Sequence, residues 1–159
     1  MRPPLADVLN LEPHPEGGWY RQTWCAAARL RTRDGRDRAA ATLIHFLLPA
    51  GECSAWHRVA SEEIWLAHRG VVALELGGDG DEPRPGDVQT LGVDPSAGQW
   101  TQVVVPAGVW QRTLAAETDA LVSCVVAPGF DFEDFELADR MRLTQRYPQH
   151  ASVITELTR

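Results

Sequence analysis

The chain has 159 residues, of which 44% are hydrophobic and 23% charged. This is the balance of an ordinary globular protein, and it excludes the low hydrophobicity and high charge of a disordered chain. A folded domain of this length buries roughly 70% of the surface that its unfolded chain exposes, so one hydrophobic core is sufficient. We therefore expect residues 1–159 to form a single domain.

The formal net charge is −7, and all fifteen basic residues are arginine. Net negative charge repels nucleic-acid phosphates and anionic lipids, so we expect neither nucleic acid nor a membrane as a partner. No apolar run approaches the ~20 residues that cross a bilayer, and no signal-like stretch follows Met1. The sequence therefore predicts a cytoplasmic protein. Its three cysteines lack CxxC spacing, which favours neither a disulfide framework nor a thiolate zinc site.

The first quarter of the chain predicts one short helix and the first strands. Residues 5–11 suit a helix that ends before Pro13, because the residue before a proline avoids the α region. Residues 19–24 alternate in the manner of a strand, and residues 29–38 are charged and suited to a solvent-exposed loop. A compact apolar strand is predicted at residues 41–48.

Short strands continue along the rest of the chain. They are predicted at residues 54–57, 63–68, 71–76, 88–91, 100–105, 111–114 and 121–126. Glycine and proline turns separate them, which favours an all-β sandwich or barrel. After Gly129 the apolar residues recur near a helical period, so we predict a helix, or two short ones, over residues 133–147 that packs outside the β structure.

One glycine-bounded segment carries a histidine and a carboxylate at fixed spacing. Its order is Gly51, five residues, His57, one residue, Val59, three residues, Glu63, six residues and Gly70. It resembles the first cupin motif, in which the position of Val59 normally holds a second histidine. Side chains two apart on a strand face the same way, so positions 57 and 59 are expected to point together into the interior.

Residues 98–111 resemble the second cupin motif, with a turn at residues 106–108 and Gln111 where a histidine normally stands. In metal-binding cupins the four motif positions converge on one ion. Val59 cannot ligate, Gln111 offers only a neutral amide oxygen, and a stable first-row metal site normally needs three or more His or carboxylate ligands. We therefore expect no cofactor. A divalent metal remains the alternative, and its candidate ligands are His57, Glu63 and Gln111, with His45 or His68 recruited from elsewhere.

The resemblance extends beyond the general cupin motifs. Five blocks resemble the cupin-5 (DUF985) subfamily in order and spacing: residues 14–21 (HPEGGWYR), 54–57 (SAWH), 62–65 (EEIW), 105–111 (VPAGVWQ) and 127–135 (APGFDFEDF). The resemblance implies an RmlC-like double-stranded β-helix, a jelly-roll barrel, which the short helices predicted near both termini would flank. It also implies a pocket for a small-molecule ligand and a homodimer.

The candidate catalytic residues are His57, Glu63 and Tyr20. If His57 lies in the interior near Glu63, that carboxylate would raise the pKa of the imidazole toward the working range of a general base. The alternative is a buried structural histidine. Tyr20 is the candidate acid, but only if its strand turns Tyr20 and not Arg21 toward the pocket, because neighbouring residues on a strand face opposite ways.

Other residues are candidates for ligand binding. Arg21 would clamp a phosphate or carboxylate if it faces the pocket, and would be a surface residue otherwise. Gln111 would offer a donor and an acceptor. Trp56, Trp65 and Trp110 lie within the two motifs, where they form either aromatic walls of the pocket or packing residues.

Three functions fit this pattern. The first is a metal-independent isomerase or epimerase acting on a carbonyl-bearing small molecule such as a keto-sugar derivative, with His57 as base. The second is a non-catalytic module that binds or senses a metabolite. The third is a metal-dependent cupin enzyme with a reduced ligand set, which Val59 disfavours. The sequence leaves open whether the protein is an enzyme.

Overall fold

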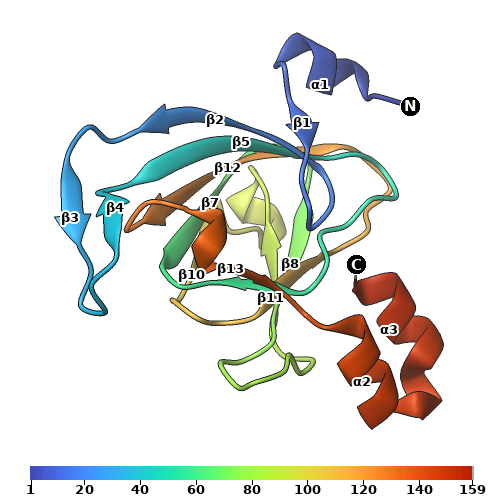
Figure 1. Cartoon of the computed structure of the whole chain (residues 1–159). Helices are drawn as coiled ribbons and strands as arrows, with labels where there is room; N and C mark the ends of the chain where they lie inside the picture. The colour runs from blue at the N-terminus through green and yellow to red at the C-terminus, as the bar shows by residue number, and fades with distance from the viewer. Residues whose placement is uncertain (159) are drawn as a thin grey trace.

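The computed structural model describes residues 1–158, without the side chains of residues 146, 153, 156 and 157. Within this range the chain folds into two facing antiparallel sheets (Figure 1). The six-stranded sheet has the order β1 (Glu12–Pro13), β2 (Trp19–Cys25), β5 (Thr42–Leu48), β12 (Ala120–Ala127), β7 (Glu62–Arg69) and β10 (Gln102–Val105). The five-stranded sheet has the order β13 (Phe135–Leu137), β6 (His57–Val59), β11 (Gln111–Leu114), β8 (Val72–Leu76) and β9 (Val88–Leu91).

Helices cover the ends of the sandwich. Helix α1 (Pro4–Val8) lies near β1, while α2 (Arg140–Arg146) and α3 (Ala151–Leu157) pack together outside the sheets (Figure 1). Three 3₁₀ turns complete the fold: η1 (Pro95–Ala97), η2 (Phe132–Asp134) and η3 (Pro148–His150). No helix in the described part of the chain is long and apolar enough to span a membrane.

Alternation along the strands builds the core between the sheets. On β7, Trp65 points inward while its neighbours Ile64 and Leu66 point outward, and on β12 Val122 and Cys124 are buried in the same layer. The main apolar cluster consists of Phe46, Leu48, Trp65, Val72, Leu74, Leu91, Val103, Val105, Ala120, Val122 and Cys124. The two sheets thus form the predicted jelly roll, as a sandwich rather than as one sheet closed on itself.

Residues 29–38, predicted as a loop, form part of a small hairpin instead. Strands β3 (Arg29–Arg31) and β4 (Asp37–Ala39) pair with each other and make a separate two-stranded sheet. The Arg29 Nε donates to both carboxylate oxygens of Asp37 at 3.1 Å, so charges that indicated a solvent-exposed loop pair across the two strands. Charge alone did not reveal this pairing.

The predicted helix at residues 133–147 is wrong in its first half. Phe135–Leu137 is the edge strand β13, which pairs with β6, and the helix begins only at Arg140. The Asp139 side chain caps α2 by accepting the N–H of Arg142 at 3.0 Å, which fixes the helix start. The apolar residues at 132 and 135 belong to the sandwich and not to a helix face. At the N-terminus, α1 ends at Val8 and not at Leu11.

Two glycines of the first cupin motif offer a test of the fold. Both Gly51 and Gly70 have φ near +75°, but a Cβ on Gly70 would lie 2.3 Å from the Asp119 carbonyl oxygen, whereas a Cβ on Gly51 would meet nothing within 4 Å. Gly51→Ala should therefore lower the free energy of unfolding by only about 1–2 kcal/mol, which is the cost of a left-handed backbone for alanine. Gly70→Ala should lose about 3 kcal/mol or more of the free energy of unfolding, because the backbone must shift. Equal losses in urea denaturation would contradict this packing.

Candidate functional site

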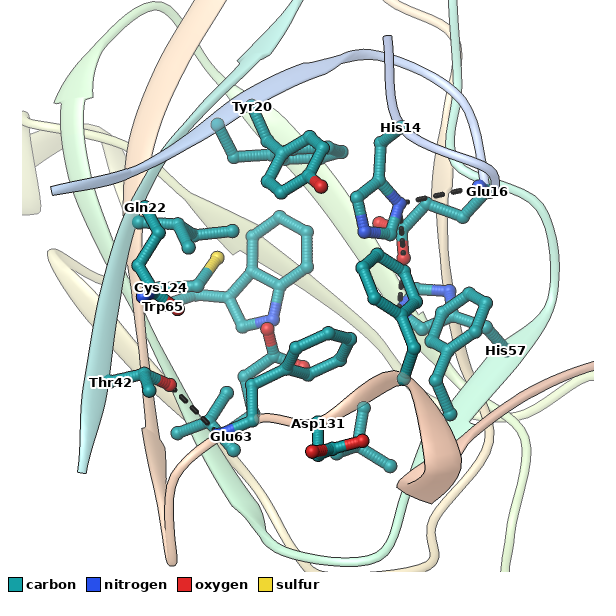
Figure 2. Close-up of a pocket in the computed structure, with 17 residues that line it drawn as sticks. His14, Glu16, Tyr20, Gln22, Thr42, His57, Glu63, Trp65, Cys124 and Asp131 are labelled. Carbon is teal, nitrogen blue, oxygen red and sulfur yellow. Dashed lines mark hydrogen bonds and ion pairs between the residues drawn. The ribbon is translucent and has the colours of Figure 1, made fainter. Parts of the chain in front are cut away.

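A cavity of about 370 Å³ opens between the two sheets (Figure 2). Its polar lining comes from the turn before β2, from β2 itself and from inward positions on β5, β6, β7 and β12. The rest of the wall is aromatic and aliphatic. The lining residues are His14, Glu16, Tyr20, Gln22, Thr42, Ile44, Phe46, His57, Val59, Glu63, Trp65, Cys124, Val126, Phe130, Asp131, Phe132 and Phe135.

A tight turn before β2 delivers Glu16 to the cavity. The His14 N–H donates to the Gly18 carbonyl and the Gly17 N–H to the His14 carbonyl, each at 3.0 Å. A Cβ on Gly18 would lie 2.8 Å from the Leu47 carbonyl oxygen, so the turn packs too closely against β5 for a larger residue. The Ala55 N–H donates to the Glu16 carbonyl at 2.7 Å, which joins the turn to the segment leading into β6.

Glu16 and two histidines form a buried cluster. One Glu16 carboxylate oxygen, Oε2, lies 3.2 Å from His57 Nε2 and 3.3 Å from His14 Nδ1. His57 Nδ1 lies 2.8 Å from the Ala55 carbonyl, which can only accept a hydrogen bond, so Nδ1 carries a proton. The Glu16 N–H donates to His14 Nδ1 at 3.3 Å. Figure 2 shows all three side chains at one side of the cavity.

This geometry requires a proton between Glu16 and His57. Burial lowers the pKa of His57 to about 4 and that of His14 to about 3, so both rings are neutral near pH 7. A neutral His57 with its proton on Nδ1 presents a lone pair at Nε2, and two lone pairs 3.2 Å apart repel each other. The contact is favourable when one proton is shared between Glu16 Oε2 and His57 Nε2. We call this contact the Glu16–His57 pair.

The sequence-based reason for a raised His57 pKa is therefore wrong. Burial dominates, and it lowers the pKa. Glu63 does not form an ion pair with His57 among the described contacts; it is held from the other sheet. Gln111 Nε2 donates to Glu63 Oε2 at 2.5 Å, and Trp65 Nε1 donates to Gln111 Oε1 at 3.0 Å. The Trp65 donor thus sets which way the Gln111 amide points.

Glu63 is an acid that titrates near neutral pH. Burial raises its pKa from 4.5 to about 7, although hydrogen bonds from Gln111 and the Cys124 thiol pull the pKa down. Burial and the neighbouring carboxyls also raise the pKa of Cys124, which keeps that thiol protonated as a donor. A carboxyl group in an apolar strand needs either a hydrogen-bond partner or a proton, and Glu63 has both available.

The strand β2 turns Tyr20 and Gln22 toward the cavity and Arg21 away from it. Tyr20 and Gln22 line the cavity, while Arg21 is exposed and pairs with His45 across the sheet. Figure 2 shows the Tyr20 hydroxyl directed into the open space. The candidate acid therefore lies in the site, and the candidate anion clamp, Arg21, lies outside it.

Only one of the three motif tryptophans reaches the cavity. Trp65 lines it, whereas Trp56 and Trp110 pack with Ala138 and Leu143 beneath the C-terminal helices. Trp110 Nε1 also donates to the Gly80 carbonyl at 2.8 Å. Trp56 and Trp110 therefore take the packing role of the two roles expected for them, and neither lines this cavity.

The four cupin motif positions do not present a metal-binding donor set. Val59 is a buried hydrocarbon, and Gln111 turns its N–H toward Glu63 while its oxygen accepts the Trp65 N–H. His45 and His68 sit at outward-facing strand positions, where His68 Nε2 lies 2.6 Å from Ser123 Oγ, so neither joins the cavity. Within the described residues no group of three or more His, Cys, Asp or Glu side chains is arranged to hold a metal.

Comparison with known proteins agrees with this architecture. Residues 4–138 match the family model described as "Cupin superfamily (DUF985)". The chain belongs to the DUF985 family of cupins.

Three relatives support the family and the fold. An uncharacterized protein of Saccharomyces cerevisiae is 28% identical over 148 residues, covering 82% of this cupin and 71% of the yeast protein. A solved structure from Shewanella oneidensis is 34% identical with a TM-score of 0.81, covering 98% of this chain and 95% of its own. A hypothetical protein from Leishmania major is 31% identical with a TM-score of 0.80, covering 96% of each chain. The predicted family and jelly-roll fold are thus confirmed.

Sequence reasoning missed several residues of this cupin's site. His14 and Glu16 lie in a turn that lacks strand periodicity, so nothing fixed where their side chains would point. Phe130 and Phe132 also line the cavity, although the sequence offered no reason to place them there. The only feature of the sequence that pointed to these four residues was their place in two blocks, residues 14–21 and 127–135, that resemble the subfamily. The homodimer implied by that resemblance stays a prediction.

Stability should report the titration of Glu63. A carboxyl with a raised pKa in the folded state holds its proton more tightly there, so the cupin should lose stability as pH rises from 4.5 through about 7. The difference between these two pKa values corresponds to about 3 kcal/mol. Glu63→Gln should remove this loss: the variant should gain stability relative to the wild type between pH 5 and pH 8 in urea denaturation.

The lowered pKa values of His14 and His57 make stability rise with pH below pH 6.5. This contribution is the same in wild type and Glu63→Gln, so it cancels when their stabilities are subtracted. Glu62→Gln is the matched control, because Glu62 is exposed on the same strand. A stability difference between Glu63→Gln and wild type that stays constant from pH 5 to pH 8 would show that Glu63 titrates normally.

Proposed function

We propose that this cupin is a metal-independent isomerase that moves a proton at the carbon next to a carbonyl group of a small molecule. The observation that carries the proposal is that two proton-carrying groups line the same cavity: Glu63, with a pKa of about 7, and the Glu16–His57 pair. An isomerase of this kind needs one group that accepts a proton and one that donates it. In this cavity, different residues could perform the two steps.

Glu63 is suited to be the base. A general base works best when its pKa lies near the operating pH, and burial has brought the pKa of this carboxyl to about 7. Gln111 Nε2 and the Cys124 thiol hold the carboxylate when it ionises, so the base is oriented before any ligand arrives. A carbon acid placed beside Glu63 would lose its proton to a lone pair of the carboxylate.

The Glu16–His57 pair and Tyr20 are suited to stabilise the enolate and return a proton. Removal of the proton places negative charge on the carbonyl oxygen, and a hydroxyl or carboxylic acid aimed at that oxygen stabilises it. The Tyr20 hydroxyl points into the cavity, and the Glu16–His57 pair holds a proton at the side that His14 also lines (Figure 2). His57, expected to be the base, is thus reassigned to the donor side.

Two alternatives remain to be separated from this proposal. In the first, the same groups recognise a metabolite without turnover, which the mixed polar and aromatic lining would also permit. In the second, the protein is a metal-dependent cupin. Its donor set argues against the second alternative, since Gln111 directs an N–H where a ligand would have to offer a lone pair.

Exchange of a carbon-bound deuteron tests the proton transfer. The probe is 4-(hydroxymethyl)acetophenone with a deuterated methyl group, and proton NMR follows loss of deuterium into water. The rate should rise with pH and level off above about pH 7, as Glu63 ionises. Glu63→Gln should lower it about 10²–10⁴-fold, the range for loss of a general acid or base. His57→Gln should lower it as well.

His68→Gln is the control, since His68 lies outside the cavity on the same strand as Glu63. A rate that falls as pH rises through 7 would make Glu63 the donor and contradict its role as base. Saturable binding of the probe with no exchange above the uncatalysed rate would favour the binding module.

Metal content tests the donor-set argument directly. After exposure to Fe(II), Mn(II), Ni(II) and Zn(II) and desalting, we expect the purified protein to retain no stoichiometric metal in elemental analysis. One metal per chain that is lost in His57→Ala would overturn the metal-independent assignment. His68→Ala serves as the control, because loss of metal in that variant would place the ion on the outer face of the sheet.

A further inference from the structure

Three acidic side chains line the cavity, and no arginine among the described residues does. Glu16, Glu63 and Asp131 contribute carboxyl groups, while no arginine lines the cavity within the described part of the chain, and the sequence contains no lysine. The two histidines in the wall do not supply positive charge near pH 7, because burial lowers the pKa of both. The cavity therefore carries net negative charge once Glu63 ionises.

The nearby arginines are engaged elsewhere. Arg38, which is buried beside the mouth, donates from Nε to Asp134 Oδ2 at 2.8 Å and from Nη2 to Asp134 Oδ1 at 3.0 Å. Arg36 pairs with the same carboxylate. Arg21 lies on the outer face of the sheet, beside His45. None of these guanidinium groups is placed to receive an anion inside the cavity.

The aromatic wall adds to this polarity. Phe130, Phe132 and Phe135 contact one another at ring-centroid distances of 5.0 to 6.1 Å and line the cavity together with Asp131. Phenylalanine side chains offer an anion no hydrogen-bond donor, whereas an ammonium group can make a cation–π contact with a ring. The aromatic wall thus gives no support to an anionic ligand.

We propose that the cavity selects its ligand by charge, admitting uncharged and amine-bearing carbonyl compounds and rejecting those that carry a phosphate or carboxylate. This inference rests on the proposed function for the carbonyl group and adds the class of substrate. It excludes phosphorylated sugars and nucleotide-linked keto-sugars, which an arginine clamp at residue 21 would have bound. It favours free keto-sugars, amino ketones and similar molecules.

Three matched probes isolate charge from shape. They are 4-acetylbenzoate, 4-(hydroxymethyl)acetophenone and 4-(aminomethyl)acetophenone, which share the aryl ketone and differ in the charge of one substituent. Isothermal titration at pH 8 should give the tightest dissociation constant for the amine. The carboxylate should bind at least about tenfold more weakly than the alcohol, because charges a few ångströms apart interact strongly away from bulk water. Inorganic phosphate should not bind saturably.

A pair of capping aspartates provides matched variants. Asp131 accepts the Glu133 N–H at 2.9 Å at the cavity mouth, and Asp139 accepts the Arg142 N–H at 3.0 Å outside the cavity. Asparagine keeps the accepting oxygen in both places. Asp131→Asn should reduce the ratio between amine and carboxylate affinities by several-fold, while Asp139→Asn should leave that ratio unchanged.

The outcomes separate this inference from the proposed function. Equal or tighter binding of the carboxylate, or failure of the uncharged probe to bind, would overturn charge selection. An equal change in both capping variants would overturn the role of Asp131. The expected order of affinities without deuterium exchange from the bound ketones would support charge selection and refute the isomerase. Deuterium exchange without the expected order of affinities would support the isomerase and refute charge selection.

Discussion

The structure depends most on how it accommodates one carboxyl group in its interior. Glu63 is removed from water, which would cost several kcal/mol if the ionised group had no partner. Its partner comes from the opposite sheet, because Gln111 is on β11 while Glu63 and Trp65 are both on β7. The Trp65–Gln111–Glu63 chain of hydrogen bonds therefore joins the two sheets across the core, and it orients the group that we assign as the base.

A second set of polar contacts fixes part of the cavity wall. Asp134 ends the 3₁₀ turn that carries Phe132, and it binds Arg38 on the β3–β4 hairpin through two hydrogen bonds. The hairpin thereby fixes the segment that supplies Asp131 and the phenylalanine wall. Asp134 is shared by Arg36 and Arg38, and Asp34 and Glu133 add a second carboxylate to each arginine, so this link adds no net positive charge beside the cavity. The polarity of the site is thus set partly by ion pairs that never reach a ligand.

Strand periodicity predicted the parts of the site that lie on strands. The spacing of His57 and Glu63 placed both side chains in the interior. Strand alternation allowed two orientations of β2, and the structure adopts the one with Tyr20 inside. The same rule, applied further, favours the packing role for two tryptophans. Trp56 and Trp110 directly precede His57 and Gln111, so alternation turns them to the opposite face, where they pack under the helices.

Loops and edges escaped prediction for physical reasons. Glu16 reaches the cavity through a turn whose direction depends on contacts with β5 and with Ala55, far apart in sequence. Strand β13 has only three residues, and its pairing with β6 determines that it is a strand. Its apolar spacing continues into α2, so a local pattern could not separate the two. Tertiary contacts, rather than local preference, decide such segments.

The exchange of histidine for glutamine at position 111 explains how a cupin framework can serve proton transfer. An imidazole there would offer a lone pair, and together with His57 and Glu63 it would favour a cation at their centre. The amide, held by the Trp65 N–H, offers a hydrogen-bond donor instead. A carboxylate that binds a donor and lacks a cation keeps a pKa raised by burial. Glutamine at this position thus supports the carboxyl group that we propose as the base, and Val59 makes the adjacent wall apolar.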